Sequence, residues 1–276
     1  MSKAAAPAIP ALLLVGCGQM GGALLRGWRA RHLAERYVIV EPGPGAASFA
    51  GEPDVTLAPG ADRLPPDLRP SVIVFAVKPQ VMGEVLSAYR RFAAGGTLFL
   101  SIAAGKTLGF FARQLGAAAS VVRAMPNMPA AIGRGIAVAC ASGAVAAVQR
   151  TLAERLLGAV GEVGWVEDEA LIDAVTAVSG SGPAYVFLLI ECLVKAGVAA
   201  GLPEDLALRL ARATVAGSGE LARLSPEPAA RLRESVTSPG GTTRAALDVL
   251  MAPDGLEPLM TRAVLAAARR SRELAD

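Results

Sequence analysis

The chain carries near its amino end the segment Leu12-Leu-Leu-Val-Gly-Cys-Gly-Gln-Met-Gly-Gly22. Four apolar residues lead into Gly16-x-Gly18-x-x-Gly21, and an amphipathic run follows at once. A strand, a tight glycine turn and a helix start are the context in which this pattern indicates a dinucleotide site. Gly16 would permit the sharp turn, Gly18 would let the backbone approach a pyrophosphate, and Gly21 would let the helix pack close to its strand. The amino end of that helix would offer N–H groups and partial positive charge to the phosphates.

An acidic residue ends the next strand-like run, Tyr37-Val-Ile-Val-Glu41. An acid about 20 residues beyond the glycines hydrogen-bonds a ribose 2′-hydroxyl in such sites. The same carboxylate would repel a 2′-phosphate, so we expect NADH to be used at least as well as NADPH. The alternative for the glycines is a plain strand-to-helix turn without a nucleotide.

The segment Leu14-Val-Gly-Cys17 also resembles a lipoprotein cleavage box, which would make Cys17 a lipidated amino terminus. Only one basic residue, Lys3, precedes it, and Pro7 and Pro10 interrupt the apolar run. Cleavage would also destroy the glycine turn, so the dinucleotide interpretation is preferred.

Composition limits the class of protein. The 276 residues are 53% hydrophobic and 18% charged, which indicates a globular chain of one large or two modest domains. The net charge is only +3 and aromatic residues make up 4%, so no nucleic-acid partner is expected. No apolar stretch free of charge and glycine reaches the roughly 18 residues of a membrane span, so no membrane partner is expected either.

Cysteine and histidine usage narrows the chemistry. Cys17, Cys140 and Cys192 are odd in number and widely spaced, which fits neither a disulfide framework nor a zinc site. With no credible signal peptide, a cytoplasmic location is expected. His32 is the only histidine and is expected on the surface, which excludes histidine-based metal sites and Ser-His-Asp triads. No metal is expected.

The first half of the chain alternates strand-like and helical runs, which predicts a parallel sheet wound with helices. The predicted strands are Ala11–Val15, Tyr37–Val40, Ser71–Ala76, Gly96–Ser101, Ser120–Ala124 and Gly135–Ala139, with weaker ones at Val55–Leu57 and Val163–Val166. The predicted helices are Met20–Ala34, Val81–Phe92, Thr107–Leu115 and Ala144–Leu157.

From about Asp168 onward the chain consists of Ala- and Leu-rich helical runs. They are predicted at Ala170–Val178, Pro183–Ala200, Pro203–Leu224, Pro228–Ser235, Thr243–Leu250 and Leu256–Leu274. Glu191 and Lys195 are the only charges between residues 184 and 198, and a helix so apolar is usually buried on most sides. A domain of this size would struggle to bury it, so we expect a second chain to pack here.

Three turns after predicted strands are expected to face the cofactor, because ligands bind outside the carboxyl ends of the strands in such sheets. The first is Phe75-Ala-Val-Lys-Pro-Gln80, where Lys78 would meet a phosphate or ribose or would merely be a turn lysine. The second is Ser101-Ile-Ala-Ala-Gly105, whose small residues would let the chain pass close to a flat ring. The third contains Asn127, which would face the nicotinamide or substrate, or stabilise the turn.

Two further glycine clusters lie in the second half. Ser179-Gly-Ser-Gly-Pro-Ala-Tyr185 is expected to serve a close helix–helix crossing at Gly180 and Gly182. Val236-Thr-Ser-Pro-Gly-Gly-Thr-Thr-Arg244 combines two glycines and several hydroxyls before a predicted helix. Such a turn would hold a carboxylate or phosphate through backbone N–H groups. The alternative is ordinary capping of the helix by Ser238 or Thr242.

On these motifs the chain resembles the pyrroline-5-carboxylate reductases, enzymes of proline biosynthesis. The resemblance rests on Gly16-Cys-Gly-Gln-Met-Gly21, Val77-Lys-Pro79, Ser101-Ile-Ala-Ala-Gly105, Asn127 between Pro126 and Pro129, Leu171-Ile-Asp-Ala-Val-Thr176, Ser179-Gly-Ser-Gly-Pro-Ala-Tyr185 and Val236-Thr-Ser-Pro-Gly-Gly-Thr-Thr243. It runs nearly end to end and is weakest over residues 42–70. The last two motifs are the specific ones.

The resemblance implies an α/β fold with an N-terminal Rossmann-type doubly wound sheet over residues 1–166, and a C-terminal all-α dimerisation and substrate domain over residues 167–276. It implies NAD(P)H as cofactor, 1-pyrroline-5-carboxylate as substrate, and homodimers that often assemble into decamers. With Glu41 and Asn127, the expected cofactor-binding residues are Val15, Gly16, Cys17, Gly18, Gln19, Met20, Gly21, Ala76, Val77, Lys78, Pro79, Ile102, Ala103 and Ala104. The implied substrate-binding residues are Ser238, Gly241, Thr242 and Thr243, and the Thr243 hydroxyl would act near the imine nitrogen. Glu169 falls where some members place an acid near the nicotinamide.

The chemistry of the residues agrees with an NAD(P)H-dependent oxidoreductase that acts on a C=N bond. Hydride transfer to a protonated cyclic imine needs positioning and a proton at nitrogen but no histidine base, whereas 2-hydroxy acid dehydrogenation commonly uses one. A β-hydroxyacid dehydrogenase is the alternative enzyme, but it would need Asn one helical turn after Lys195, where this chain has Ala199. A non-catalytic dinucleotide-binding regulator is the other alternative, and the hydroxyl-rich turn argues against it.

Overall fold

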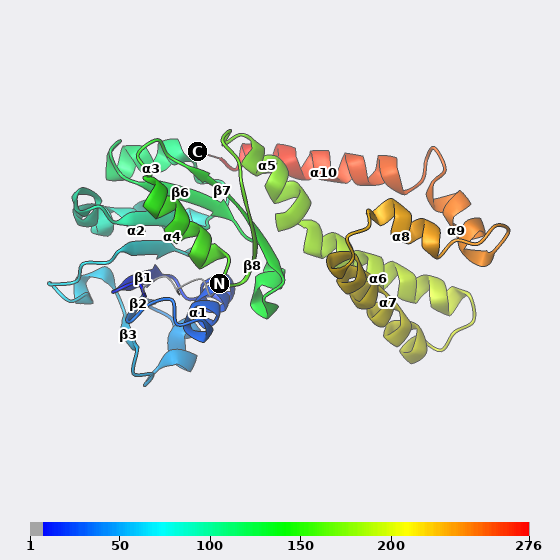
Figure 1. The fold of residues 1–276 in the computed structure, drawn as a ribbon, viewed down its shortest axis with the longest axis horizontal. Helices are drawn as coiled ribbons and strands as arrows, with labels where there is room; N and C mark the ends of the chain where they lie inside the picture. Colours follow the sequence, from blue (N-terminus) through cyan, green and yellow to red (C-terminus); the bar gives the residue numbers. More distant parts are fainter. Residues whose placement is uncertain (1–7, 276) are drawn as a thin grey trace, which may run out of the picture. The chain divides into compact units, whose positions relative to one another are not determined.

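The structure, a computed structural model, describes residues 8–275 of the chain (Figure 1). Contacts divide these residues into two compact units. Residues 8–180 and 268–275 form the first, here called the sheet unit, and residues 181–267 form the second, the helical unit. Helix α5 (Leu171–Val175) stays with the sheet unit, in which Ile172 is 1% exposed. The functional division of the chain between residues 166 and 167 stays a prediction.

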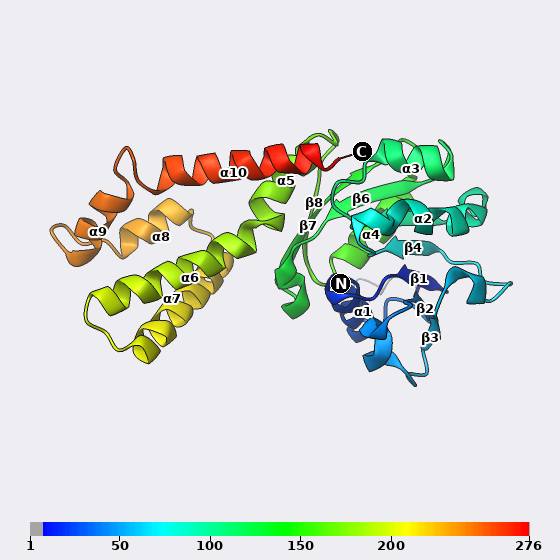
Figure 2. The ribbon, with the colours of Figure 1, turned by 180° about the vertical axis from the view of Figure 1, so that it is seen from behind.

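The sheet unit is built on a mixed sheet of eight strands in the order β3-β2-β1-β4-β5-β6-β7-β8 (Figure 2). The strands are β1 (Leu12–Val15), β2 (Tyr37–Val40), β3 (Val55–Ala58), β4 (Val72–Phe75), β5 (Leu98–Ser101), β6 (Val121–Met125), β7 (Gly135–Ala141) and β8 (Gly161–Trp165). Strand β1 lies between β2 and β4, so cleavage before Cys17 would remove a central strand. This position argues against the lipoprotein interpretation.

Strand β7 corrects the expectation of a parallel sheet, because it runs antiparallel to β6. All other neighbours in the sheet are parallel. The connection from β6 to β7 comprises only residues 126–134, including a 3₁₀ turn at Met128–Ile132. A parallel crossover requires a dozen residues or more, so this short connection favours an antiparallel return.

Helices cover both faces of the sheet, as alternate residues of β1 make clear. Leu12 and Leu14 belong to one buried cluster with residues of α1 (Gln19–Ala30) and α4 (Ala147–Leu157). Leu13 and Val15 belong to a second buried cluster with residues of α2 (Met82–Leu86) and α3 (Leu108–Leu115). A strand buried on both faces has a continuous run of apolar residues, which is the pattern at residues 12–15.

The helix expected over Val81–Phe92 is wrong in part, because α2 ends at Leu86 and a 3₁₀ segment covers Ser87–Gly95. At this change the Ser87 hydroxyl donates a hydrogen bond to the carbonyl oxygen of Glu84. Serine side chains compete in this way with the backbone bonds of a regular helix. Further 3₁₀ turns at Pro44–Phe49, Ala61–Arg63 and Pro79–Val81 complete the connections.

The helical unit has little core of its own. It contains α6 (Gly182–Ala199), α7 (Glu204–Leu224), α8 (Ala229–Ser235), α9 (Thr242–Leu250) and most of α10 (Leu256–Glu273). No residue of α6 is buried, and Phe187 and Leu188 are 51% and 57% exposed. Among the described residues, one helical stretch, 171–199, is long and apolar enough by composition to cross a membrane. Only 6% of the most apolar part of this stretch is buried. An unburied apolar surface of this kind marks an interaction site.

Candidate functional site

The glycine turn at residues 16–21 is packed so tightly that a side chain would not fit at Gly16 or at Gly21. Gly16 has φ +90°, and a Cβ there would lie 2.8 Å from the backbone of Ala76. A Cβ on Gly21 would collide with the carbonyl oxygen of Gly16, whereas a Cβ on Gly18 would meet no described atom within 4 Å beyond Gly18 and its two chain neighbours. Gly18 therefore borders open space, as the approach of a pyrophosphate requires. Gly18 also immediately precedes α1, whose amino end has no side-chain cap and no acidic residue in its first turn.

Glu41 lies beside this turn and is hydrogen-bonded to its backbone. One carboxylate oxygen, Oε2, accepts a hydrogen bond from the Cys17 N–H at 2.7 Å. The other, Oε1, accepts from the Gly43 N–H at 2.9 Å. The carboxylate is thus fixed at the carboxyl end of β2, beside the turn expected to bind the dinucleotide.

Cys17 is buried in the turn with 1% of its surface exposed. Burial, together with the nearby Glu41 carboxylate, raises the pKa of its thiol from 9.0 to about 11, against a lowering effect of Arg26. The thiol is therefore protonated and unreactive at neutral pH, because the thiolate is the nucleophilic form. Cys17 contributes backbone and packing to this site.

The turns after β4 and β5 lie beside the first turn. The Ala76 N–H donates to the carbonyl oxygen of Val15, and the Ile102 N–H donates to that of Phe75. Lys78 is exposed at the start of the 3₁₀ turn that Pro79 opens. Backbone bonds of this kind bring the carboxyl ends of three parallel strands together at one edge of the sheet.

The expected cofactor-binding residues therefore occupy connected positions. Val15 ends β1 and residues 16–21 follow it. Glu41 follows β2, Ala76 to Pro79 follow β4, and Ile102, Ala103 and Ala104 follow β5. Their roles in binding stay predictions.

Asn127 follows β6 and has a structural partner. Its side-chain oxygen accepts a hydrogen bond from the Ile136 N–H at 2.9 Å, which ties the turn at residues 126–134 to β7. This contact supports the turn-stabilising alternative. Its role toward the cofactor stays a prediction.

Glu169 joins three parts of the sheet unit. Its Oε1 lies 2.8 Å from Nη1 of Arg123 and accepts a hydrogen bond from the Leu108 N–H, also at 2.8 Å. Arg123 is only 4% exposed. One sequence signal for this pair exists, an arginine inside the apolar strand Val121–Met125, because a buried charge requires a partner. The structure therefore gives Glu169 an architectural contact that the resemblance did not indicate.

The turn before α9 in the helical unit is open and rich in hydroxyls. Gly240 has φ +68°, and the Gly241 N–H donates to the carbonyl oxygen of Ser238 at 3.1 Å. Gly241 immediately precedes α9, whose amino end has no side-chain cap, so the capping alternative for Ser238 and Thr242 is not realised. Ser238 and Thr242 are exposed and Thr243 is half-buried. Uncapped N–H groups at a helix start suit an anion such as a carboxylate.

The glycine cluster at residues 179–185 differs from the expected helix–helix crossing. A Cβ on Gly180 would lie 2.6 Å from Cε of Met125, a residue of β6. Among the described residues, no atom lies within 4 Å of a Cβ on Gly182. Gly180 is therefore required by packing against a strand of its own unit, and the expectation of a helix crossing is wrong for this residue.

His32, the single histidine of the chain, belongs to none of the turns described above. His32 is exposed in the turn after α1, with φ +50°. No group of three or more His, Cys, Asp or Glu side chains that could hold a metal ion occurs between residues 8 and 275.

Comparison with protein families matches both parts of the chain. Residues 169–274 match the family described as pyrroline-5-carboxylate reductase dimerisation. Residues 11–105 match the family described as NADP oxidoreductase, coenzyme F420-dependent. The second match covers β1 to β5, which carry most of the expected cofactor turns.

Whole-chain relatives agree with these matches. The chain is 40% identical to the pyrroline-5-carboxylate reductase of Pseudomonas aeruginosa over 97% of both chains. Among solved structures, that of a pyrroline-5-carboxylate reductase from Coxiella burnetii superposes with a TM-score of 0.89 at 32% identity, over 96% of this chain and 98% of that one. The Plasmodium falciparum pyrroline carboxylate reductase, solved with NADP bound, gives a TM-score of 0.80 at 30% identity over 97% and 98% of the two chains.

Proposed function

The chain belongs to the pyrroline-5-carboxylate reductase family, and from this premise we propose how its own residues divide the work. The protein is an oxidoreductase that reduces 1-pyrroline-5-carboxylate to L-proline in proline biosynthesis, with NAD(P)H as cofactor. Its helical part is of the dimerisation family, so the chain forms oligomers. NAD(P)H supplies the hydride when it is bound.

The cofactor is proposed to bind at the carboxyl ends of β1, β2, β4 and β5. The fit of the residues supports this assignment, because Gly18 borders open space and the amino end of α1 has neither a cap nor an acid. Backbone N–H groups there would hold the pyrophosphate. Glu41 would accept a hydrogen bond from a ribose hydroxyl, which favours NADH at least as much as NADPH. Ala76 to Pro79, Ile102 to Ala104 and Asn127 would complete the site.

The substrate is proposed to bind at the turn before α9. The observation that carries this proposal is the uncapped, hydroxyl-bearing amino end of α9. Its N–H groups and the hydroxyls of Ser238 and Thr242 would bind the substrate carboxylate, and Gly241 would let the ring approach the backbone. Thr243 would place its hydroxyl at the ring nitrogen and hold the proton there while the carbon is reduced.

The division of the chain into a cofactor domain, residues 1–166, and a dimerisation and substrate domain, residues 167–276, is proposed on the same grounds. The apolar side chains of α6, exposed in the single chain, would be covered by a second copy. We further propose assembly of dimers into decamers in the cytoplasm, with no nucleic-acid or membrane partner.

The proposed activity and cofactor preference are tested by steady-state kinetics. The purified protein is given 1-pyrroline-5-carboxylate and either NADH or NADPH, and the absorbance of the reduced nicotinamide is followed. We expect oxidation that depends on both substrates, and NADH turnover at least equal to NADPH turnover. No oxidation with either cofactor would contradict the catalytic assignment.

A further inference from the structure

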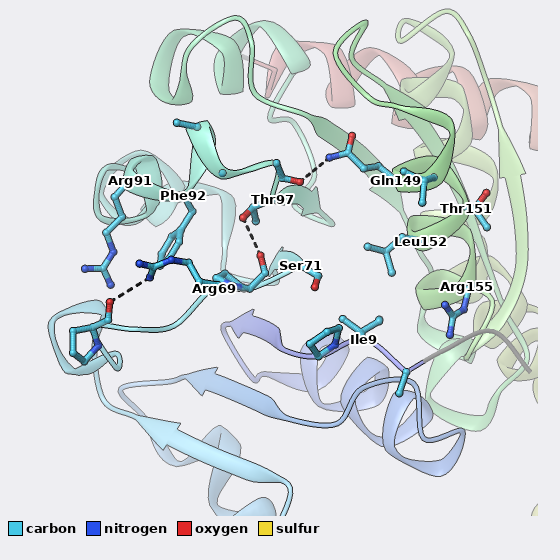
Figure 3. Close-up of a pocket in the computed structure, with 18 residues that line it drawn as sticks. Ile9, Arg69, Ser71, Arg91, Phe92, Thr97, Gln149, Thr151, Leu152 and Arg155 are labelled. Carbon is cyan, nitrogen blue, oxygen red and sulfur yellow. Dashed lines mark hydrogen bonds between the residues drawn. The ribbon is translucent and has the colours of Figure 1, made fainter.

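A large cavity lies at the edge of the sheet opposite the cofactor turns (Figure 3). Its volume is about 1060 Å³, and it is bordered by Ile9 before β1, Ser71 before β4 and Thr97 before β5. These residues precede the amino ends of three parallel strands, whereas the glycine turn follows the carboxyl end of β1. The cavity is therefore separate from the cofactor turns within the sheet unit.

The charge around this cavity is of one sign. Arg69, Arg91 and Arg155 line it, and none of the described residues that line it is Asp or Glu. Neither Arg69 nor Arg91 forms an ion pair within residues 8–275. Arg69 donates to the carbonyl oxygens of Leu68 at 3.0 Å and Pro66 at 3.4 Å, and the Arg91 guanidinium lies 4.8 Å from the ring centroid of Phe92.

Two further features favour an anion in the same place. The first turns of α4 contribute Val148, Gln149 and Thr151 to the lining, and the first turn of that helix holds no acidic residue. The amino end of a helix carries partial positive charge. In Figure 3 the guanidinium groups of Arg69 and Arg91 lie on the same side of the cavity, while Arg155 lies on the other.

The rest of the lining is mostly apolar, with Ser71, Thr97, Gln149 and Thr151 as its polar side chains. Val148 is 75% exposed and Leu152 is half-buried, and both border the cavity from α4, while Ile9 and Phe92 lie buried in its wall. Pro10, Pro66 and Pro70 add rigid apolar surface. An inorganic ion would use only the arginines and leave this surface in contact with water. The lining thus matches a ligand with both an anionic group and an apolar body.

We propose that this cavity binds a small organic phosphate, in which a phosphate ester is carried by an apolar or aromatic group. Guanidinium groups match phosphate oxygens with paired N–H donors, and a dianion suits the two arginines on the same side of the cavity. The volume is at the upper end of the range of small-molecule sites. The ligand binds while the cofactor turns are occupied, because the two places lie at opposite edges of the sheet.

The probe for this site is 1-naphthyl phosphate, titrated by calorimetry into the full chain in saturating NADH, which blocks the cofactor turns. We expect saturable binding that weakens as sodium chloride is added, since exposed charges are screened. Inorganic phosphate, 1-naphthol and 1-naphthoate are the comparison ligands. Each of these ligands lacks the phosphate ester or the apolar body. We therefore expect each to have a Kd at least about tenfold higher, which is the effect of losing one charge-assisted hydrogen bond.

The matched variants are Arg91→Gln and Arg90→Gln. Arg90 is the exposed neighbour of Arg91 on the same segment and does not line the cavity. We expect Arg91→Gln to raise the Kd for 1-naphthyl phosphate about tenfold, Arg91→Glu to abolish binding, and Arg90→Gln to leave the Kd unchanged. Turnover with NADH checks that each variant is folded.

Three results would overturn the proposal. They are no binding of 1-naphthyl phosphate by the unaltered chain, equal binding of inorganic phosphate, and equal effects of Arg90→Gln and Arg91→Gln. A fourth result, 1-naphthoate binding as tightly as the phosphate ester or more tightly, would overturn the assignment to phosphates. Because these readouts measure binding apart from catalysis, they do not depend on where the substrate is bound.

Discussion

In the turn at residues 16–21 of the sheet unit, Gly16, Cys17 and Gly21 are buried and only Gly18 and Gln19 are exposed. The turn at residues 238–243 of the helical unit has no buried residue. Both precede a helix whose amino end has no side-chain cap. In the first, backbone atoms of Ala76 and Gly16 leave no room for side chains at two of the three glycines. In the second, hydroxyl groups surround the glycines. The contrast teaches that one anion site is fixed by packing, and the other is built from groups that are available to a ligand.

The largest expected effect tests the packing of the first turn. Gly16→Ala would place a Cβ against the backbone of Ala76 at a positive φ. We expect the free energy of unfolding to fall by about 2–4 kcal/mol, as measured by denaturant titration. Gly18→Ala is the matched control, since its Cβ meets open space, and its effect should stay within about 0.5 kcal/mol. Equal losses in the two variants would contradict the packing argument.

The second prediction tests the hydroxyls of the open turn. Thr243→Ala removes the hydroxyl proposed to act at the ring nitrogen, and kcat should fall about a hundredfold without a change in cofactor affinity. Thr243→Ser keeps the hydroxyl and should retain most of the turnover. If cofactor binding weakened while kcat at saturating NADPH held, the role given to Thr243 would be wrong.

The third prediction concerns the acid that holds the first turn. Glu41→Gln keeps an oxygen acceptor for the Cys17 N–H and removes the charge that would repel a 2′-phosphate. The ratio of kcat/KM for NADPH to that for NADH should therefore rise about tenfold. Glu35→Gln, an exposed acid outside the turn, is the control. A strong preference of the unaltered protein for NADPH would show that Glu41 does not select the cofactor.

The smallest effect follows from the buried thiol of the first turn. Burial raises the pKa of Cys17 from 9.0 to about 11 in the folded chain, so the unfolded chain loses this proton first as the pH rises. Between about pH 9 and 11, stability should fall by about 1–2 kcal/mol on account of this group, and Cys17→Ala should remove that part of the pH dependence. Cys192→Ala serves as control. An unchanged alkaline profile in Cys17→Ala would contradict the burial argument.

The first turn was predictable from the sequence because its determinants are local. Strand β2 has the predicted bounds, Tyr37–Val40. Strand β4, Val72–Phe75, is one residue shorter at each end than the predicted strand Ser71–Ala76. The periodicity of the apolar residues, the spacing of the glycines and the order of the segments along the chain are sufficient to predict a strand, a turn and a helix start. The turn at residues 238–243 was identified in the same way from its glycines and hydroxyls.

Contacts between residues that are far apart in the chain could not be predicted from the sequence. The Arg123–Glu169 ion pair joins residues 46 positions apart and has no local pattern. The direction of β7 depends on the length of a connection whose ends were uncertain, and the packing of Gly180 on Met125 depends on where β6 lies. The cavity at the amino ends of β1, β4 and β5 likewise exists only once the sheet is assembled.

The most direct test of the division between the two turns is a crossed measurement of KM for NADH and for 1-pyrroline-5-carboxylate. Gly18→Ala should raise the KM for NADH about tenfold and leave the KM for 1-pyrroline-5-carboxylate within about twofold. Ser238→Ala should do the reverse. If either variant raised both constants equally, the two turns would not bind separate ligands, and the account would be contradicted.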